Sequence, residues 1–189
     1  MAVFVNSFFE ERVDQLFDLA RLVEKIFASA GLEYRVVGGL AAYLYVEERE
    51  PDAGRLTKDI DILVRREDLQ KIGKAVEPFG LEYRHAAGVD MLVQTAEPSA
   101  RRAVHLIFAG EKVRQDYPEP TPELGSYRTI KGIRLLPLAD LVRMKLTSFR
   151  AIDEAHLKDL DDAGLVTADI EAGLSPVLRE RMARLRARE

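Results

Sequence analysis

The 189-residue chain contains no cysteine, which excludes disulfides, thiolate metal sites and cysteine nucleophiles. It also contains no run approaching the ~18 apolar residues that a membrane-spanning helix needs. No basic leader precedes an apolar run at the amino terminus, and Asn6 and Ser7 interrupt the apolar stretch there, so we expect no secretory signal peptide. These absences predict a cytoplasmic protein with no membrane partner.

Several catalytic signatures are missing as well. The sequence has no Gly-x-Ser-x-Gly elbow, no Walker phosphate loop and no His-Glu-x-x-His zinc motif. Its composition, 47% hydrophobic and 32% charged, is typical of a globular protein rather than a disordered one. The length suits one domain with an appendage. We therefore predict a domain over residues 1–135 and a helical carboxyl-terminal extension over residues 136–189 that packs on it.

The net charge of −4 predicts no general attraction to nucleic acid. The carboxyl terminus differs locally, because residues 178–189 hold five arginines, at 179, 181, 184, 186 and 188, against two glutamates. Two interpretations stay open: a solvated terminal helix, or a contact with an acidic partner such as RNA.

The first 64 residues alternate between helix and strand patterns. Ser7 and Glu10 form a capping box, and apolar residues then repeat at helical spacing until Gly31. A β-rich run at 34–37 leads into glycines and a second helix at 40–46. After a polar loop, residues 59–64 alternate as a strand does.

The remainder predicts a mixed sheet and a helical tail. The expected elements are a helix at 67–77, a meander of three strands at 81–85, 89–94 and 103–108, a proline-rich loop at 111–128, and helices at 138–150, 153–163 and 176–188. The fold class is α+β, with a mixed sheet flanked by helices.

Asp59 and Asp61 carry the first chemical signal. Residues two apart on a strand point the same way, which sets these carboxylates about 6–7 Å apart at the backbone. Like charges so close repel unless a cation lies between them, and hard oxygen ligands select Mg²⁺ or Mn²⁺. The alternative is a pair of solvated aspartates on an exposed strand face.

Gly38 and Gly39 carry the second signal. A strand that ends in two glycines and enters a helix lets backbone N–H groups approach an anion such as phosphate. A tight turn without a ligand is the alternative. The position of these glycines, about twenty residues before Asp59-Ile60-Asp61, favours the phosphate interpretation.

Strand, Gly38-Gly39, helix, loop and an Asp-x-Asp strand together resemble the DNA polymerase beta-type nucleotidyltransferase superfamily. The likeness covers residues 8–110 well, and it is nearer to small bacterial members, some of them toxin–antitoxin components. It implies that the glycines support a nucleoside triphosphate, that Asp59 and Asp61 bind Mg²⁺, and that a third carboxylate lies on a later strand. The implied reaction is in-line attack on the α-phosphate between two metal ions, with pyrophosphate leaving.

The sequence departs from this pattern at the third carboxylate. The residue expected to align with it is His105, which could act as a general base or as an auxiliary ligand. Asp90, on the preceding strand, is the alternative if the register differs. A third possibility is that the site binds a nucleotide without transferring it.

The helical tail supplies further candidates. Lys145 falls inside the apolar arc of its helix, where it would pair with phosphate, or its side chain would snorkel to the surface. Ser148 lies one turn further on and would assist in nucleotide binding. Asp153, His156 and Asp159 stack on one helical face, as a wall of the cleft or as a surface network. Near the Asp-x-Asp strand, we assign Lys58 to the triphosphate and leave Arg55 in a solvated loop.

The leading prediction is Mg²⁺-dependent transfer of a nucleoside monophosphate from an NTP to an acceptor. The acceptor (RNA, protein or a small molecule) would bind near residues 111–135, and the base preference and oligomeric state stay open. A degenerate nucleotide-binding or protein-interaction module is the alternative, and a toxin–antitoxin component is a third possibility.

Overall fold

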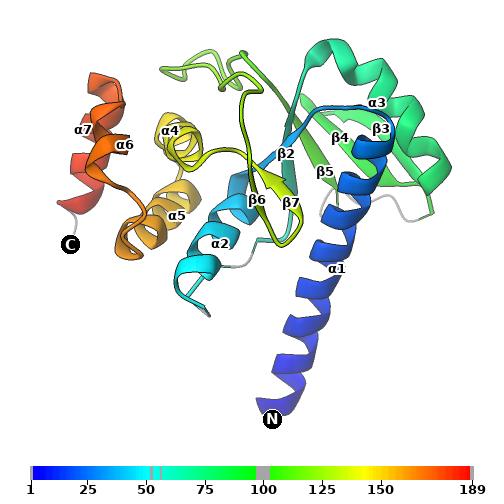
Figure 1. Cartoon of the computed structure of the whole chain (residues 1–189), viewed down its shortest axis with the longest axis horizontal. Helices are drawn as coiled ribbons and strands as arrows, with labels where there is room; N and C mark the ends of the chain where they lie inside the picture. Colours follow the sequence, from blue (N-terminus) through cyan, green and yellow to red (C-terminus); the bar gives the residue numbers. More distant parts are fainter. Residues whose placement is uncertain (1, 52, 56, 97–102, 188–189) are drawn as a thin grey trace.

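The computed structural model describes residues 2–51, 53–55, 57–96 and 103–187, with side chains from residue 14 onward. This part of the chain forms seven α-helices and a mixed seven-stranded sheet, which confirms the α+β prediction (Figure 1). The helices are α1 (Ala2–Ser29), α2 (Gly38–Arg49), α3 (Leu69–Val76), α4 (Leu138–Ser148), α5 (Ala151–Asp162), α6 (Ala168–Ala172) and α7 (Pro176–Arg186). The strands are β1 (Arg35–Val37), β2 (Ile60–Val64), β3 (Leu81–Ala86), β4 (Val89–Gln94), β5 (Val104–Phe108), β6 (Arg128–Ile130) and β7 (Ile133–Leu135).

The sheet order is β3-β4-β5-β2-β1-β7-β6. The predicted meander of β3, β4 and β5 is antiparallel, as expected. β2 lies at the centre, antiparallel to β1 and parallel to β5. This arrangement brings the ends of three strands together around Asp61.

One face of β2 belongs wholly to the core. Ile60, Ile62 and Val64 are completely buried, as their alternation predicts. On the other face Leu63 is also completely buried, whereas the Asp61 side chain keeps 27% of its surface exposed. The second face is therefore open only near the start of the strand.

The carboxyl-terminal helices gather on one side of the molecule, and α3 covers part of the opposite side (Figure 1). α4 and α5 pack on α2, and α7 packs on both of them. The amino-terminal half of α1 extends away from the sheet (Figure 1). The division of the chain at residue 135 stays a prediction. None of the described helices combines the length and apolarity needed to cross a membrane.

Two predictions about element ends are wrong. α1 begins at Ala2 rather than at the Ser7 capping box, since no glycine or proline between them stops a helix. The helix expected over 138–150 ends at Ser148, because Phe149 adopts a left-handed conformation with φ 46°.

Short elements went unpredicted. α6 spans five residues, and β6 and β7 span three residues each, too few to show a periodicity. The turn between β6 and β7 uses Lys131 and Gly132, both at positive φ, where a hairpin of this kind usually shows Asn-Gly or Asp-Gly.

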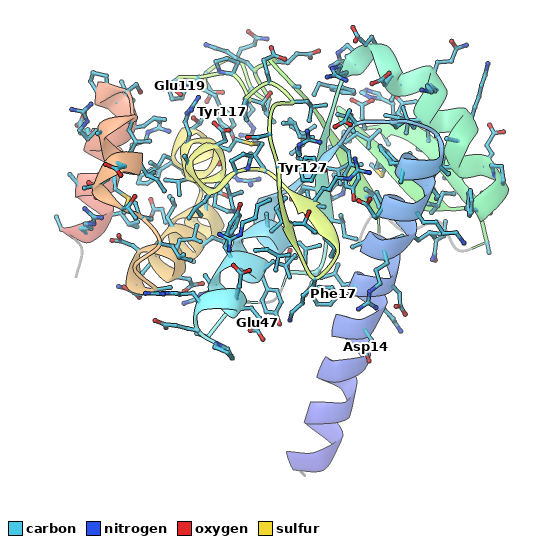
Figure 2. All side chains as sticks on the ribbon, viewed as in Figure 1. Asp14, Phe17, Glu47, Tyr117, Glu119 and Tyr127 are labelled. Carbon is cyan, nitrogen blue, oxygen red and sulfur yellow. The ribbon has the colours of Figure 1, made fainter. Side chains whose placement is uncertain are left out.

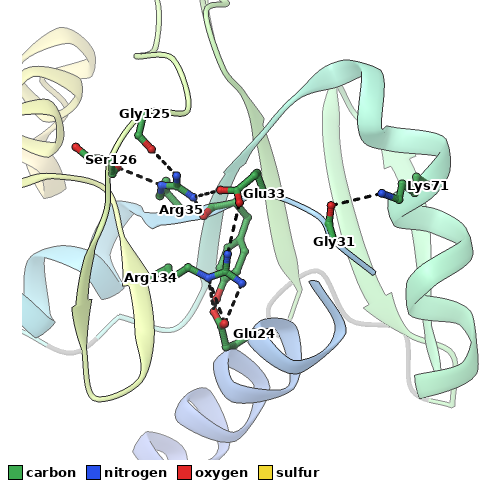
Figure 3. Close-up of polar contacts among 9 residues, drawn as sticks. Glu24, Gly31, Glu33, Arg35, Lys71, Gly125, Ser126 and Arg134 are labelled. Carbon is green, nitrogen blue, oxygen red and sulfur yellow. Dashed lines mark hydrogen bonds and ion pairs between the residues drawn. The ribbon is translucent and has the colours of Figure 1, made fainter. Parts of the chain in front are cut away.

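Buried arginine side chains fix the segment at 111–127, which forms neither helix nor strand, as predicted. Arg35 of β1 donates to the carbonyl oxygens of Gly125 and Ser126, so the end of the segment is tied to the sheet (Figure 3). Beside it, Arg134 of β7 holds Glu24 of α1 through hydrogen bonds of 2.9–3.2 Å (Figure 3).

Candidate functional site

The candidate site begins where β1 ends. Val37, its last residue, lies opposite Asp61 of β2, and Gly38 follows with φ +65°. A Cβ built on Gly38 would lie 1.9 Å from Asp61 Oδ2, so a side chain cannot be accommodated there without displacing the carboxylate. α2 also begins at Gly38, and among the described residues no side chain caps it. Its first backbone N–H groups are thus placed beside a carboxylate.

Asp59 lies immediately before β2 and is half-buried. Burial raises the pKa of Asp59 above its usual value; His105 and Lys58 oppose this shift, and the charge of Asp61 reinforces it. Lys58 itself is exposed. A carboxyl group in this setting is stabilised in its charged form by a cation.

His105 lies beside Asp61, because the parallel register of β2 and β5 places the two residues opposite each other. The imidazole Nδ1 is 3.2 Å from Asp61 Oδ1. Asp90 pairs with Leu106 instead and so faces the other side of the sheet. There it contacts the Tyr83 hydroxyl, which excludes Asp90 as the third carboxylate of this site.

Three described side chains could bear on a metal here. Asp59 and Asp61 offer hard oxygen ligands, and His105 offers a nitrogen. Within the described residues, no group of three or more acidic, histidine or cysteine side chains has the geometry to hold an ion alone. Mg²⁺ bound to proteins often takes one or two carboxylates and completes its shell with water and substrate phosphates, and two aspartates fit that manner of binding.

Lys145 of α4 lies on the same side of the sheet. It is 3% exposed, which confirms its predicted place in the apolar arc and makes the snorkelling alternative wrong. Its Nζ lies 3.0 Å from His156 Nδ1 and 3.5 Å from Asp153 Oδ1. Burial lowers the pKa of Lys145, while Asp153 and Asp61 oppose that shift.

Asp153 of α5 is likewise 3% exposed and gathers donors around it. The Ser148 hydroxyl donates to Asp153 at 2.8 Å and Arg150 Nε donates at 2.7 Å, in addition to the Lys145 ion pair. Burial alone would raise the pKa of Asp153, but Arg150, Lys145 and Ser148 together hold it below its usual range. Asp153 therefore stays ionised beneath the site.

The predicted polar stripe of Asp153, His156 and Asp159 lies on one helix, α5. Asp159 accepts from Arg55 Nε at 2.8 and 3.1 Å, so Arg55 is ion-paired rather than only solvated. His156 is 6% exposed, and burial lowers its pKa to about 4, which makes the imidazole neutral at pH 7. The stripe thus contacts both α4 and the loop before β2.

A pocket of about 140 Å³ connects these groups. Its lining includes Gly38, Asp61, Lys145, Ser148, Arg150 and Asp153, together with residues of the 111–127 segment. Figure 2 shows two of those, Tyr117 and Glu119, beside α4. Thr147 also lines the pocket, and it carries a buried hydroxyl without a hydrogen-bond partner in the described part of the chain.

Sequence reasoning missed Arg150, Thr147, Tyr117 and Glu119. The last two lie in a proline-rich segment without periodicity, and only the presence of tyrosine and glutamate near the predicted acceptor region could have drawn attention to them. Arg150 and Thr147 flank the left-handed Phe149, whose conformation turns both toward the pocket wall.

The arginines of the carboxyl-terminal helix are used within the protein. Arg181 donates to the carbonyl oxygens of Leu146 and Thr147, and Arg186 pairs with Asp161 and Glu171. Arg188 lies outside the described residues. The described part of α7 therefore favours a structural interpretation of the arginine-rich tail.

Comparison with known proteins gave one similar curated sequence. No family model matches the chain. It is 28% identical over 158 residues to one component of the aspartyl/glutamyl-tRNA(Asn/Gln) amidotransferase of Erythrobacter litoralis. The alignment covers 79% of this chain and 30% of that protein, so the chain spans less than a third of its relative's length.

Solved structures resemble the whole fold. ANT(2″)-Ia in complex with adenylyl-2″-tobramycin has a TM-score of 0.51 at 15% identity, covering 90% of this chain and 98% of that one. An antigenic nucleotidyltransferase-like protein from Paracoccidioides brasiliensis has 0.55 at 15%, covering 93% and 89%. The Megavirus polyadenylate synthase has 0.55 at 11%, covering 87% and 36%. The chain therefore has a nucleotidyltransferase fold, as its motifs predicted.

Proposed function

We propose that the chain transfers a nucleoside monophosphate from a nucleoside triphosphate to an acceptor, with Mg²⁺. One observation carries the proposal: the start of α2 at Gly38, the Asp61 carboxylate and the buried Lys145 all border one pocket. A helix N-terminus favours an anion, and a buried ammonium adds a positive charge beside it.

The chain's own groups take separate roles. The backbone N–H groups at Gly38 and Gly39 hold phosphate oxygens, Lys145 neutralises part of the triphosphate charge, and Lys58 approaches it from the exposed side. Ser148 acts at the same wall of the pocket through its hydrogen bond to Asp153.

Asp59 and Asp61 would hold Mg²⁺, which supplies charge stabilisation to the phosphates when bound. His105 accepts the proton of the attacking hydroxyl, because a neutral imidazole can serve as a base near pH 7. The Asp61 carboxylate, 3.2 Å from Nδ1, orients this ring.

The acceptor would approach past Tyr117 and Glu119. One similar structure holds an adenylylated aminoglycoside, and another is a polyadenylate synthase, so small molecules and RNA both belong in an acceptor screen. Protein acceptors belong there too, since some members of the resembling superfamily act as toxins.

The test uses each of the four NTPs labelled at the α-phosphate, with Mg²⁺ and with total RNA, total protein or a small-molecule extract. We expect the wild type to transfer the label and D61N to lose the transfer. D90N is the matched control, because Asp90 faces the other side of the sheet, and it should behave as wild type. Transfer that persists in D61N would contradict the proposal.

His105 supports a second candidate, a module that binds a nucleotide without transferring it. An imidazole stands beside Asp61 where the superfamily pattern has a third carboxylate. This candidate predicts saturable NTP binding with no pyrophosphate release from any acceptor mixture. Growth arrest on expression, abolished by D61N, would instead favour a toxin among the transferases.

A further inference from the structure

His156 is a buried polar group to which the proposed chemistry gives no task. It lies on α5, 6% exposed, between α4 and the glycine turn. A buried histidine needs partners for its nitrogens, so its surroundings indicate what it does.

Its first partner is Lys145, with Nδ1 at 3.0 Å from Nζ. An ammonium group has three N–H donors and no acceptor, so Lys145 donates and the His156 nitrogen accepts. This requires a neutral ring, consistent with the burial that lowers the pKa of His156 to about 4. Within the described residues, Asp153 and His156 take two of the three donors, which leaves the third for a phosphate oxygen.

Its second partner is the glycine turn. A Cβ built on Gly39 would lie 3.3 Å from His156 Cε1, and 2.8 Å from the Thr57 hydroxyl oxygen on the other side. The imidazole therefore packs against the backbone of the turn. One ring contacts both the ammonium and the turn that the proposed function assigns to phosphate.

We propose that His156 is a positioning residue, which fixes the Lys145 ammonium and the Gly38-Gly39 turn relative to each other so that both contact one phosphate chain. The proposal rests on the proposed function. It acts through Lys145, so the effect of changing His156 depends on whether Lys145 is present.

The probe is inorganic tripolyphosphate with Mg²⁺, which all four NTPs share whatever the base, titrated calorimetrically into the full chain. We expect H156L to weaken binding about tenfold, because Lys145 loses a hydrogen bond to a charged group and can move. Asparagine places its side-chain oxygen near the position of Nδ1, so H156N should stay within about threefold of wild type. H85N, at an exposed histidine on β3, is the control and should not change the affinity.

A double-mutant cycle separates positioning from a general structural effect. In a K145M background, H156L should cause no further loss of tripolyphosphate binding. The double variant removes both polar partners together, and such replacements are close to neutral for stability, so it should remain folded even if H156L alone does not.

The outcomes separate the two proposals. A wild type that fails to bind Mg²⁺-tripolyphosphate overturns the proposed function, and with it the purpose given to His156. If the wild type binds and H156L leaves the affinity unchanged, positioning alone is overturned. A loss from H156L that is as large in K145M as in wild type also overturns it.

Discussion

Replacing Gly38 with alanine is expected to destabilise the chain and displace Asp61. Gly38 has φ +65°, a left-handed conformation that costs an alanine roughly 1–2 kcal/mol. The new Cβ would also lie 1.9 Å from Asp61 Oδ2 and 2.8 Å from Cγ, so the carboxylate must move. Overpacking of this kind typically adds about 1–3 kcal/mol.

Gly31 is the matched control, because it has φ +59° and nothing within 4 Å of a built Cβ. Urea unfolding should show that G38A loses about 1–3 kcal/mol more than G31A. In a D61A background the nearest carboxylate atoms are gone and only the residue-61 Cβ, at 3.0 Å, remains close, so most of the excess should disappear. Equal losses in G38A and G31A, or an excess that D61A does not relieve, would show that the clash with Asp61 is not the cause.

Three further predictions concern the surroundings of the site. T147V should be neutral or stabilising, because it removes a buried hydroxyl without a partner in the described structure, whereas T121V should lose about 1–2 kcal/mol with the 2.6 Å bond to Phe108; urea unfolding of the two variants checks the contrast. Stability should fall by up to about 3 kcal/mol as pH drops from 6.5 toward 4, because the folded-state pKa of His156 is lowered from 6.5 to about 4 and the unfolded chain takes up the proton first; H156N should flatten that slope, and an unchanged slope would contradict the assignment. R181A should lose about 1–3 kcal/mol, because two carbonyl oxygens at the end of α4 lose their 2.7 Å donor; a loss below 0.5 kcal/mol, roughly the level of an ordinary surface substitution, would count against it.

Local patterns predicted much of the site. The alternation around Asp61 and the two glycines depend on backbone conformation over a few residues, which the sequence encodes directly. The burial of Lys145 followed from its place in an apolar helical arc. The placement of His105 beside Asp61 required the resemblance, since the pairing of β2 with β5 joins segments 44 residues apart.

What the sequence did not reveal depends on tertiary packing. Asp153 accepts from Lys145 and Arg150 only because α4 ends in a left-handed Phe149 and α5 turns back against it. Phenylalanine gives no local signal for that conformation. The 111–127 segment is similar, since its end is held by Arg35, about 90 residues earlier in the chain.

The proposed function depends above all on a Mg²⁺-dependent nucleotide site at Asp59 and Asp61. The decisive measurement is calorimetric titration of ATP, GTP, CTP and UTP, with and without Mg²⁺, on the wild type, the D59N/D61N double variant and the D90N control. We predict saturable, Mg²⁺-dependent binding of at least one nucleotide by the wild type and D90N, lost in the double variant. No binding by the wild type, or binding that the double variant retains, would contradict the assignment of this site.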